Sequence, residues 1–337
     1  MSESVEKMVR EARIDHAIEK RNAPRVNLAH AIREAMAEAD KAQTHRAHTP
    51  PGMHEPTAYI TTRPVRSLPA SLNSFDLPAL FGADGRLRRV PGAAPAGATI
   101  RLDAGVAVAS RVARAGAHVM VVSDNRKAHA VGATGHVALE SVNAEFRTIE
   151  AAVFGVVDIE AEGDAPIIAL PVFGASMDMR QVITKGVRFE IPRSERRRVD
   201  SGQLADEISI ALTLGIARAA DEALMAAITA TNPAAFSLGA AAAQGLQFDE
   251  LRALVGAAGT GAVVGQDGAL RAAGVPAELT GDMAGTLIGA WNRSGVAIGE
   301  DIPVHFERLG KAGELAVTAW VTVLPLLPNE AKFWSLA

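Results

Sequence analysis

The chain has 337 residues, enough for two domains or for one domain with large extensions, and its 34 basic and 38 acidic residues give a net charge of −4. That balance argues against a strongly basic nucleic-acid-binding protein. The absence of cysteine excludes disulfides, thiolate catalysis and thiolate metal sites. Hydrophobic residues make up 48% of the chain, but many are alanine and aromatics are only 4%. Because alanine buries little surface, we expect a thin subunit core that is supplemented by contacts with other subunits.

Two further features of the sequence bear on where the protein works. No apolar run approaches the roughly twenty residues needed to span a bilayer. The first fifteen residues are charged throughout and contain no apolar signal-peptide core. We therefore expect a soluble protein that is made inside the cell and has no membrane partner.

Residues 1–57 are predicted to form a polar helical arm and a linker. Leu28, Ile32 and Met36 follow one another at steps of four, the spacing of one helical face, while the rest of that face is charged. Such a helix needs a partner to fold against, so it indicates an assembly arm; a detachable extension is the alternative. The linker contains three histidines without acidic or thiol partners at ligand spacing, so we do not expect metal binding by His45, His48 and His54.

Residues 58–150 are predicted to be rich in strands broken by glycine and proline. The segments with strand character are 57–62, 98–112, 117–124, 135–142 and 153–160. No GxGxxG motif opens a helix after a strand, and the glycine-rich run at 132–139 lacks the GK[ST] that cradles phosphate. Neither nucleotide-binding fingerprint is present.

Residues 151–199 are predicted to form a long two-stranded excursion. An apolar strand at 165–173 leads into a polar stretch, and 187–199 returns as a strand in which apolar and charged side chains alternate. A two-stranded ribbon is marginal alone in water, so it must pack on something else. Four arginines close the segment and could bind phosphate, but a solvated face or ion pairs with another subunit are favoured for Arg193, Arg196, Arg197 and Arg198.

Residues 200–232 carry the strongest helical signal. Asp200 or Ser201 can cap the first turn, apolar residues recur at steps of three and four, and Asn232 precedes a proline that stops the helix. About thirty residues at 1.5 Å per residue predict a rod of about 45 Å. Glycine is unfavourable in mid-helix, so Gly215 predicts the close approach of another backbone, which the family resemblance given below would assign to the strands near 315–324.

The remaining chain divides in two. Residues 233–300 are rich in Ala and Gly, with a short helix expected near 248–259 and a strand–loop–strand pattern at 275–298. Residues 301–337 predict an antiparallel pair of strands joined by a turn at 311–313.

This order of elements, together with the stretches 187–225 and 275–337, resembles the major capsid protein of tailed bacteriophages, whose Hong Kong-type capsid fold is shared with encapsulins. The resemblance implies an α+β fold with six parts. These are an N-terminal helical arm and linker (1–57), a strand-rich N-terminal region (58–150), an extended β-hairpin loop (151–199), the long spine helix of a peripheral domain (200–232), an axial domain (233–300) and closing strands of the peripheral domain (301–337).

The resemblance implies a structural protein, not an enzyme, that self-assembles as pentamers and hexamers into an icosahedral shell enclosing phage DNA. No cofactor is expected. Expected partners are other copies of the chain, a scaffolding protein, a head protease, portal and decoration proteins, and packaged DNA bound non-specifically. The virion would be its location, after assembly in the host cytoplasm. The assembly residues that we assign are Lys185, Arg188, Arg193, Arg196, Arg197, Arg198 and Gly215.

Two alternative functions and one candidate crosslink accompany this interpretation. An encapsulin-like compartment would share the fold and hold cargo enzymes. A few capsid proteins of the family crosslink a loop Lys to an Asn of a neighbour, and Lys185 and Asn329 are the candidates here, although nothing in their surroundings singles them out. The other alternative function is that of an unrecognised α/β enzyme, but Ser110 and the other serines have no GxSxG elbow, and the histidines of the strand segments are more typical of structural hydrogen bonding.

Overall fold

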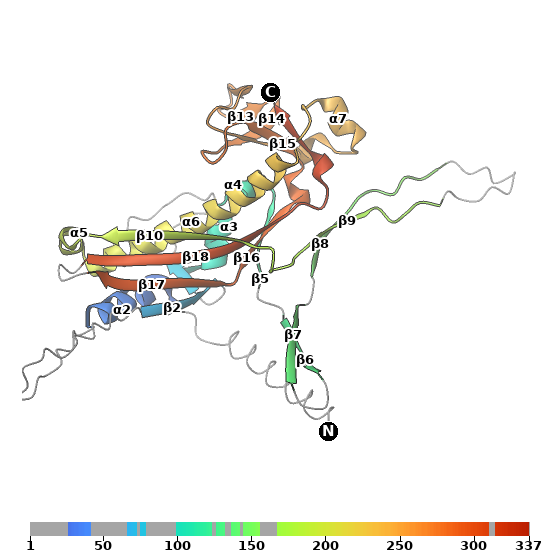
Figure 1. The fold of residues 1–337 in the computed structure, drawn as a ribbon. Helices are drawn as coiled ribbons and strands as arrows, with labels where there is room; N and C mark the ends of the chain where they lie inside the picture. The colour runs from blue at the N-terminus through green and yellow to red at the C-terminus, as the bar shows by residue number, and fades with distance from the viewer. Residues whose placement is uncertain are drawn as a thin grey trace, which may run out of the picture.

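The computed structural model describes residues 26–41, 66–72, 75–78, 99–122, 126–131, 136–141, 144–155, 167–309 and 314–336. The predicted α+β class is confirmed, since long helices and antiparallel sheets are combined in one chain (Figure 1). The linker histidines and the predicted strand at 57–62 lie outside the described residues. Among the described helices, none is both long enough and apolar enough to cross a membrane.

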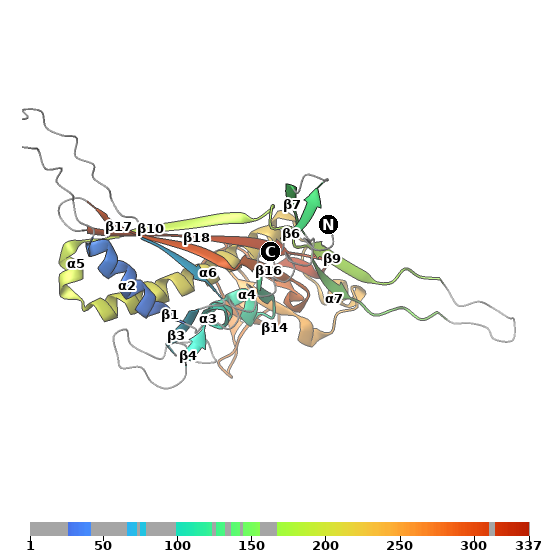
Figure 2. The same cartoon turned by 90° about the horizontal axis from the view of Figure 1, so that it is seen from below.

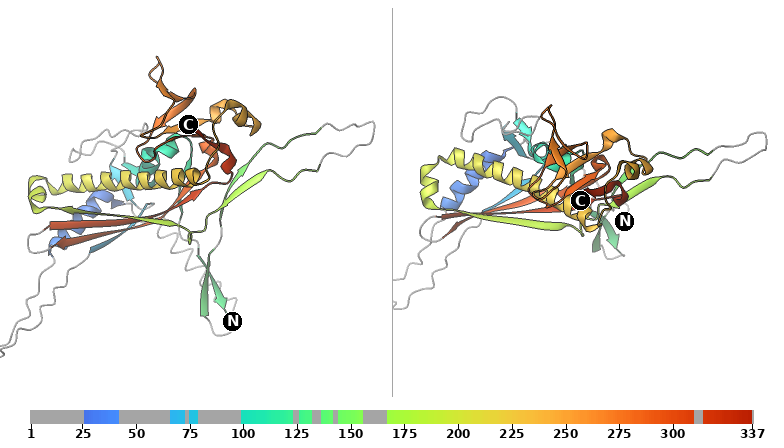
Figure 3. Two further views of the ribbon diagram at one scale, coloured as in Figure 1. Left: turned by 45° about the horizontal axis from the view of Figure 1, so that its top comes forward. Right: turned by 90° about the horizontal axis from the view of Figure 1, so that it is seen from above.

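The main body is a six-stranded sheet with a long helix on one face. The sheet has the order β2 (Arg66–Ser71), β17 (Asp301–Leu309), β18 (Glu314–Leu326), β16 (Gly295–Gly299), β5 (His118–Val122), and β10 (Ile183–Ile191) joins it beside β18. Helix α6 (Ser201–Ala230) lies along the sheet in both views of Figure 3. Around it are α2 (Leu28–Lys41), α3 (Leu102–Ala109) and α4 (Arg111–Arg114). The core of the body lies between α6, these shorter helices and the sheet.

The predicted long helix is confirmed from Ser201 to Ala230, and its ends have the expected physical causes. The Asp200 carboxylate accepts a hydrogen bond from the Gly202 N–H at 2.9 Å, which caps the first turn. Past the last turn, Asn232 adopts φ of 52°, a left-handed conformation that turns the chain away. Two polar side chains in the buried middle, Ser209 and Thr213, donate to carbonyls one turn earlier and so leave no unsatisfied hydroxyl.

Helix α2 has its apolar face covered by its own chain. Leu28, Ile32 and Met36 are all buried, and the helix packs against α6, β2 and β17. The partner that this amphipathic segment requires is therefore present within the subunit. Residues 28–41 are part of the body, and an assembly role can be kept only for residues outside the described part of the arm.

A second lobe is built on its own six-stranded sheet. Its order is β12 (Ala262–Val264), β13 (Leu270–Ala272), β14 (Val275–Leu279), β11 (Arg252–Val255), β15 (Thr286–Gly289), β19 (Phe333–Leu336). Helix α7 (Leu238–Ala243) and the short 3-10 turns η1 (Phe248–Glu250), η2 (Trp291–Arg293) and η3 (Glu330–Lys332) border it. A separate small core fills this lobe around Leu251, Val255 and Ile288. The helix predicted near 248–259 is wrong, because only η1 is helical and the apolar residues after it enter the sheet as β11.

Two other expectations for strands have opposite outcomes. The closing antiparallel pair is confirmed, with β17 and β18 in register from Val304 opposite Ala319 to Leu309 opposite Glu314. The strand predicted at 98–112 is wrong, because only β4 (Thr99–Arg101) is extended and α3 and α4 follow it. In this stretch Leu102 and Val106 are four residues apart and both buried, so helical spacing decided over the β-branched composition.

Smaller strand pairs complete the fold. β1 (Val26–Asn27), β3 (Phe75–Pro78) and β4 form a three-stranded sheet, and β6 (Arg126–Val131) pairs with β7 (His136–Ser141). β8 (Glu145–Ile149) pairs with β9 (Val172–Ser176) in an antiparallel ribbon that projects from the body. At its base, Phe146 and Ala175 pack against Leu324 and Leu326, on the face of the main sheet opposite α6.

The predicted two-stranded excursion is formed by other strands than expected. The ribbon pairs β9 with β8, whereas the returning strand β10 pairs along its whole length with β18, from Ile183 opposite Val323 to Ile191 opposite Leu315. The arginine run that we assigned to a strand forms helix α5 (Arg193–Arg198). Because β10 pairs with β18 along its whole length, this strand belongs to the body, although Val187 on its apolar side stays exposed. Figures 1 and 2 place α5 at one end of the molecule and the ribbon at the other.

Candidate functional site

The outer part of the ribbon exposes large apolar side chains on all sides. Residues 144–150 alternate between half-buried and exposed, but residues 151–155 and 167–170 are all exposed. Val153, Phe154, Ile167 and Leu170 each expose between 77% and 101% of their surface. Contiguous exposed apolar surface is rare in soluble monomers and marks a contact with another molecule. Nothing in the described part of this chain covers these side chains.

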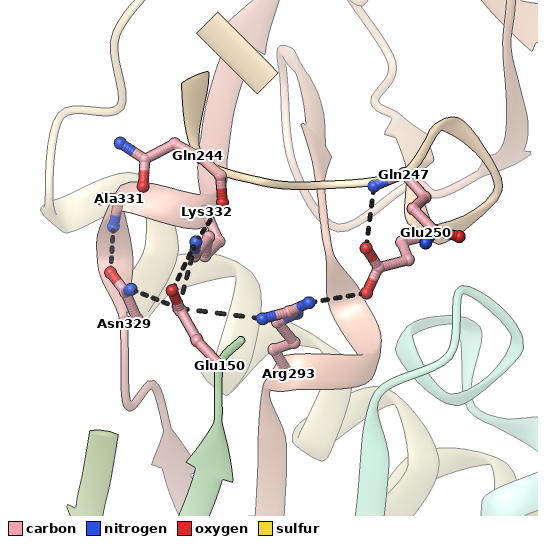
Figure 4. A network of polar contacts seen from close by, with 8 residues as sticks. All are labelled: Glu150, Gln244, Gln247, Glu250, Arg293, Asn329, Ala331 and Lys332. Carbon is pink, nitrogen blue, oxygen red and sulfur yellow. Dashed lines mark hydrogen bonds and ion pairs between the residues drawn. The ribbon is translucent and has the colours of Figure 1, made fainter. Parts of the chain in front are cut away.

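The ribbon is held to the second lobe through Glu150, which follows β8 directly (Figure 4). The Glu150 carboxylate lies 3.0 and 3.1 Å from the ammonium of Lys332, whose side chain is only 1% exposed. The Asn329 amide donates to the same carboxylate at 3.0 Å. Lys332 also donates to the Gln244 carbonyl at 2.6 Å, next to the end of α7. The ion pair therefore joins the ribbon to η3 and to α7.

Arg293 extends this network across the lobe. One nitrogen of its guanidinium lies 3.8 Å from Glu150, and another donates to Glu250 at 2.8 Å. Burial disfavours ionisation of Glu250, but the hydrogen bonds from Arg293 and from the Gln247 N–H outweigh it and hold the pKa of Glu250 below its usual range. Both carboxylates that flank Arg293 are thus bound to positively polarised groups.

An apolar groove of about 310 Å³ lies between β10 and α6. Its walls include Val187 and Phe189 from the strand and Leu212 and Ile216 from the helix. A shallower apolar groove continues toward α5, past Ile191 and Leu204. Together they form a channel that we call the β10–α6 groove, and it runs from the charged groups near Glu222 to Glu195 of α5.

Lys185 lies on the wall of the β10–α6 groove and is engaged in an ion pair with Glu222. Arg218 donates to the other oxygen of Glu222 at 3.0 Å and contacts Asp282 at 2.6 Å. The hydrogen bond from Lys185, opposed by burial and aided by Arg218, lowers the pKa of Glu222. Within the subunit, Lys185 thus ties β10 to α6, and Asn329 is bound to Glu150. Their crosslinking between subunits stays a prediction.

The predicted assembly arginines lie in two places. Arg188 is on the outer face of the main sheet, where it contacts Glu190 at 3.2 Å and Glu307 at 3.6 Å. The others are on α5, where Arg198 lies 3.5 Å from Glu195, Arg193 and Arg197 are exposed, and Arg196 is half-buried and engaged. Helix α5 presents a basic end to the molecule. Its role in assembly stays a prediction.

The close approach predicted at Gly215 is wrong. A methyl group added at this position would meet nothing within 4 Å, because Gly215 lines the open β10–α6 groove. The close helix crossing is instead at Gly105 of α3, where an added methyl would lie 2.8 Å from Leu77 and 3.6 Å from Thr213 of α6. Gly215 and the smaller side chains beside it leave space, and the helix lacks a covering element there.

The buried Ser110–Asp221 pair is the feature most similar to catalytic chemistry, and it is a helix cap. The Ser110 hydroxyl donates to Asp221 at 2.6 Å, and the N–H groups of Arg111 and Val112 donate to the same carboxylate at 2.9 and 3.2 Å. Burial raises the pKa of Asp221, although these hydrogen bonds oppose the shift. No histidine joins the pair among these contacts. In the described part of the chain, no group of three His, Asp or Glu side chains could hold a metal ion.

Two of the strand histidines have structural contacts of the expected kind. His118 contacts the Asn292 carbonyl at 3.1 Å, and the His305 ring meets Trp320 edge-on with centroids 5.0 Å apart. Sequence reasoning missed Glu150, Lys332 and Arg293 as site residues. Glu150 and Lys332 are 182 positions apart, so no local spacing could have brought them together.

Comparison with known proteins finds likeness only among solved structures. No family model matches the sequence, and no curated protein matches it. A chain of Mycobacterium phage Che8 is 12% identical over 58% of this chain and 85% of that one, with a TM-score of 0.40. The capsid of an empty GTA particle is 12% identical over 74% and 94%, with a TM-score of 0.42. A virus-like particle from Pyrococcus furiosus is 10% identical over 70% and 96%, with a TM-score of 0.37. With TM-scores below 0.5, these likenesses carry no argument about function.

Proposed function

We propose that the protein is the subunit of a self-assembling shell, a major capsid protein of the tailed-bacteriophage type whose shell encloses DNA. The observation that carries this proposal is the ribbon, which exposes Val153, Phe154, Ile167 and Leu170 beyond its last contact with the body. A monomer gains nothing from holding these side chains in water. A second copy that covers them would remove a large apolar surface from solvent.

The position of the ribbon favours assembly of many copies over a closed pair. The ribbon leaves one end of the molecule and α5 forms the other, so a ribbon that lies on the next copy makes a head-to-tail contact (Figure 2). Heterologous contacts of this kind close into rings when the rotation between copies permits it. Each contact can be modest, because several contacts per copy add multivalently.

The β10–α6 groove of the next copy is the receiving surface that we assign. Its apolar walls suit the apolar outer ribbon, and it reaches α5, the helix that carries the arginine run. Between Glu150 and Ser176 the sequence has four carboxylates and no Lys or Arg, which is complementary in charge to α5. The same assignment explains why Gly215 and Trp320 border unfilled space in the single subunit.

The purified full chain tests the proposal directly. Sedimentation velocity and electron microscopy are expected to show rings of five or six copies, or closed shells, in moderate salt. A stable 35.1 kDa monomer at high concentration would overturn the proposal. Nuclease-protected DNA in shells recovered from the native source supports a phage head, whereas shells that hold protein and no DNA would indicate an encapsulin-like compartment.

Charge reversal on α5 tests the receiving surface separately. The double variant Arg193→Glu, Arg197→Glu is expected to remain a folded subunit and to lose assembly, because both side chains are exposed and lie on α5, the helix that the groove reaches. The matched control is Arg271→Glu, which reverses one exposed charge of the second lobe. Unchanged assembly by the α5 variant would remove α5 from the contact.

A further inference from the structure

Glu150 is the last point at which the body holds the ribbon. Its N–H donates to the Pro171 carbonyl of the facing strand at 2.9 Å, and both residues are half-buried. Every described ribbon residue beyond this pair is exposed. The direction of the outer ribbon therefore depends on what holds the Glu150 carboxylate.

Three side chains of the second lobe hold that carboxylate from fixed positions. The Lys332 ammonium donates to Glu150 at 3.1 Å and to the Gln244 carbonyl at 2.6 Å, and it lies 3.0 Å from the other Glu150 oxygen. Asn329 caps the 3-10 turn that carries Lys332, with its side-chain oxygen accepting from the Ala331 N–H at 3.1 Å. The next residue, Phe333, packs edge-on against buried Trp291. Lys332 is thus unable to follow the ribbon if the ribbon moves.

Arg293 is the third residue that contacts the Glu150 carboxylate. Its guanidinium lies between Glu150 and Glu250, and Glu250 is itself held by the Gln247 N–H at 2.9 Å (Figure 4). η2, which carries Arg293, is fixed by the indole N–H of Trp291, which donates to the Arg252 carbonyl at 3.0 Å. The groups around Glu150 thus come from two separate turns of the second lobe, η3 and η2.

We propose that Lys332, Arg293 and Asn329 are positioning residues that fix the angle at which the ribbon leaves the body, and so the curvature at which successive copies join. The part about curvature rests on the proposed function. A buried ion pair contributes little net stability, because desolvation offsets its Coulombic gain, whereas it defines direction more sharply than apolar packing does. The cluster lies at the one place where a small rotation moves the whole outer ribbon.

The angle can be measured within one subunit, since the chain has no native cysteine. Spin labels are placed at Ala169→Cys on the outer ribbon and at Ala226→Cys on an exposed position of α6, in protein diluted with unlabelled chain. Pulsed electron paramagnetic resonance then gives the distance distribution between the two labels. We expect one narrow distribution in the parent, and a broadened or shifted one in Lys332→Met and in Glu150→Gln.

Arg271→Met is the matched control, because it removes an ion pair of the same lobe, with Asp267, that does not touch the ribbon. This variant is expected to keep the parent distribution. If Lys332→Met does not fold, the same measurement is made on Glu150→Gln and Asn329→Ala. Both variants weaken the contacts of Glu150 at positions that are less buried than Lys332. A lowered melting temperature with an unchanged distance distribution would overturn the inference, because the cluster would then only stabilise the fold.

Electron microscopy of the same variants tests the consequence for assembly. Particles from Glu150→Gln are expected to have a wider spread of diameters than particles from the parent or from Arg271→Met. A changed label distribution with unchanged diameters would overturn the link to curvature. If the parent forms no particles at all, the proposed function fails, and the label measurement still decides whether the cluster positions the ribbon.

Discussion

Two antiparallel strand pairs of this molecule have similar hydrophobicity and opposite surroundings. β17 and β18 form one pair, whose inward residues Phe306, Leu315 and Val317 are all fully buried against α6. β8 and β9 form the other, which continues into an outer ribbon where Phe154 is 95% exposed. Both pairs are antiparallel strands, but only the first has its apolar residues covered within the described part of the chain. The first pair is stabilised by its own chain, whereas in the proposed shell the outer ribbon is covered by another copy.

The largest expected effect on the free energy of unfolding comes from truncating a buried aromatic side chain of the body. Phe306→Ala removes a ring that is fully buried between the main sheet and its helices, and the cavity should lower the free energy of unfolding by about 3–5 kcal/mol. Denaturant unfolding of the unassembled subunit, followed by tryptophan fluorescence, measures this loss. A loss below about 1 kcal/mol would mean that the sheet is not packed as described.

Alanine substitutions in the outer ribbon should leave the stability of the subunit almost unchanged and should reduce assembly. Phe154→Ala, combined with Ile167→Ala, is expected to change the free energy of unfolding of the subunit by less than about 0.5 kcal/mol, because both side chains are exposed. Assembly should fall sharply, since the apolar surface that joins the copies is lost. Sedimentation velocity checks the result, with Phe306→Ala as the reference for a folding defect. Normal particles from the double variant would show that the outer ribbon contributes nothing to assembly.

The comparison also explains which parts of the fold could be predicted from the sequence. Helix α6 and the β17–β18 pair were predictable because their own periodicity matches the faces that their own chain covers. The apolar stretch 165–173 predicts a buried or half-buried strand, but residues 167–170 are exposed in the subunit. Hydrophobicity shows that a surface must be covered and does not show whether the same chain covers it.

The errors in strand pairing have a related cause. β10 alternates apolar and charged residues as a ribbon strand would, and only the long register with β18 assigns it to the body. Gly215 was interpreted as a close approach because glycine costs helix stability, yet the structure has open space at that point. The Glu150–Lys332 anchor was beyond prediction, because each residue is an ordinary charged side chain until the fold brings them together.

The third prediction concerns the pH dependence of the body. Burial raises the pKa of Asp221, so between its ordinary value, about 3.9, and its raised value the folded subunit holds a proton that the unfolded chain has released. The free energy of unfolding should therefore decrease as pH rises through this window. In Asp221→Asn that contribution is absent, so the stability difference, parent minus variant, should be largest at the lowest pH and shrink as pH rises.

Unfolding curves of both proteins across the acid range measure this difference. Subtraction removes the contributions of carboxylates with lowered pKa, such as Glu222, which have the opposite slope. A difference that grows with pH would show that hydrogen bonds from Ser110 and the α4 backbone outweigh burial at Asp221.

The last prediction concerns Gly215, where subunit stability and assembly should respond in opposite directions. Gly215→Ala adds a methyl group that meets nothing within 4 Å, so it should raise the free energy of unfolding by about 0.5–1 kcal/mol through helix propensity. Gly215→Leu should also fold, since its side chain would enter the β10–α6 groove. If a neighbouring ribbon occupies that groove, the leucine competes with it and assembly should fall while the subunit stays folded. Leu214→Ala, at an exposed position beside it, is the control for a change on the helix surface. Normal assembly by a stably folded Gly215→Leu would show that the groove is not the receiving surface, and the ribbon would then have to be covered elsewhere on the next copy.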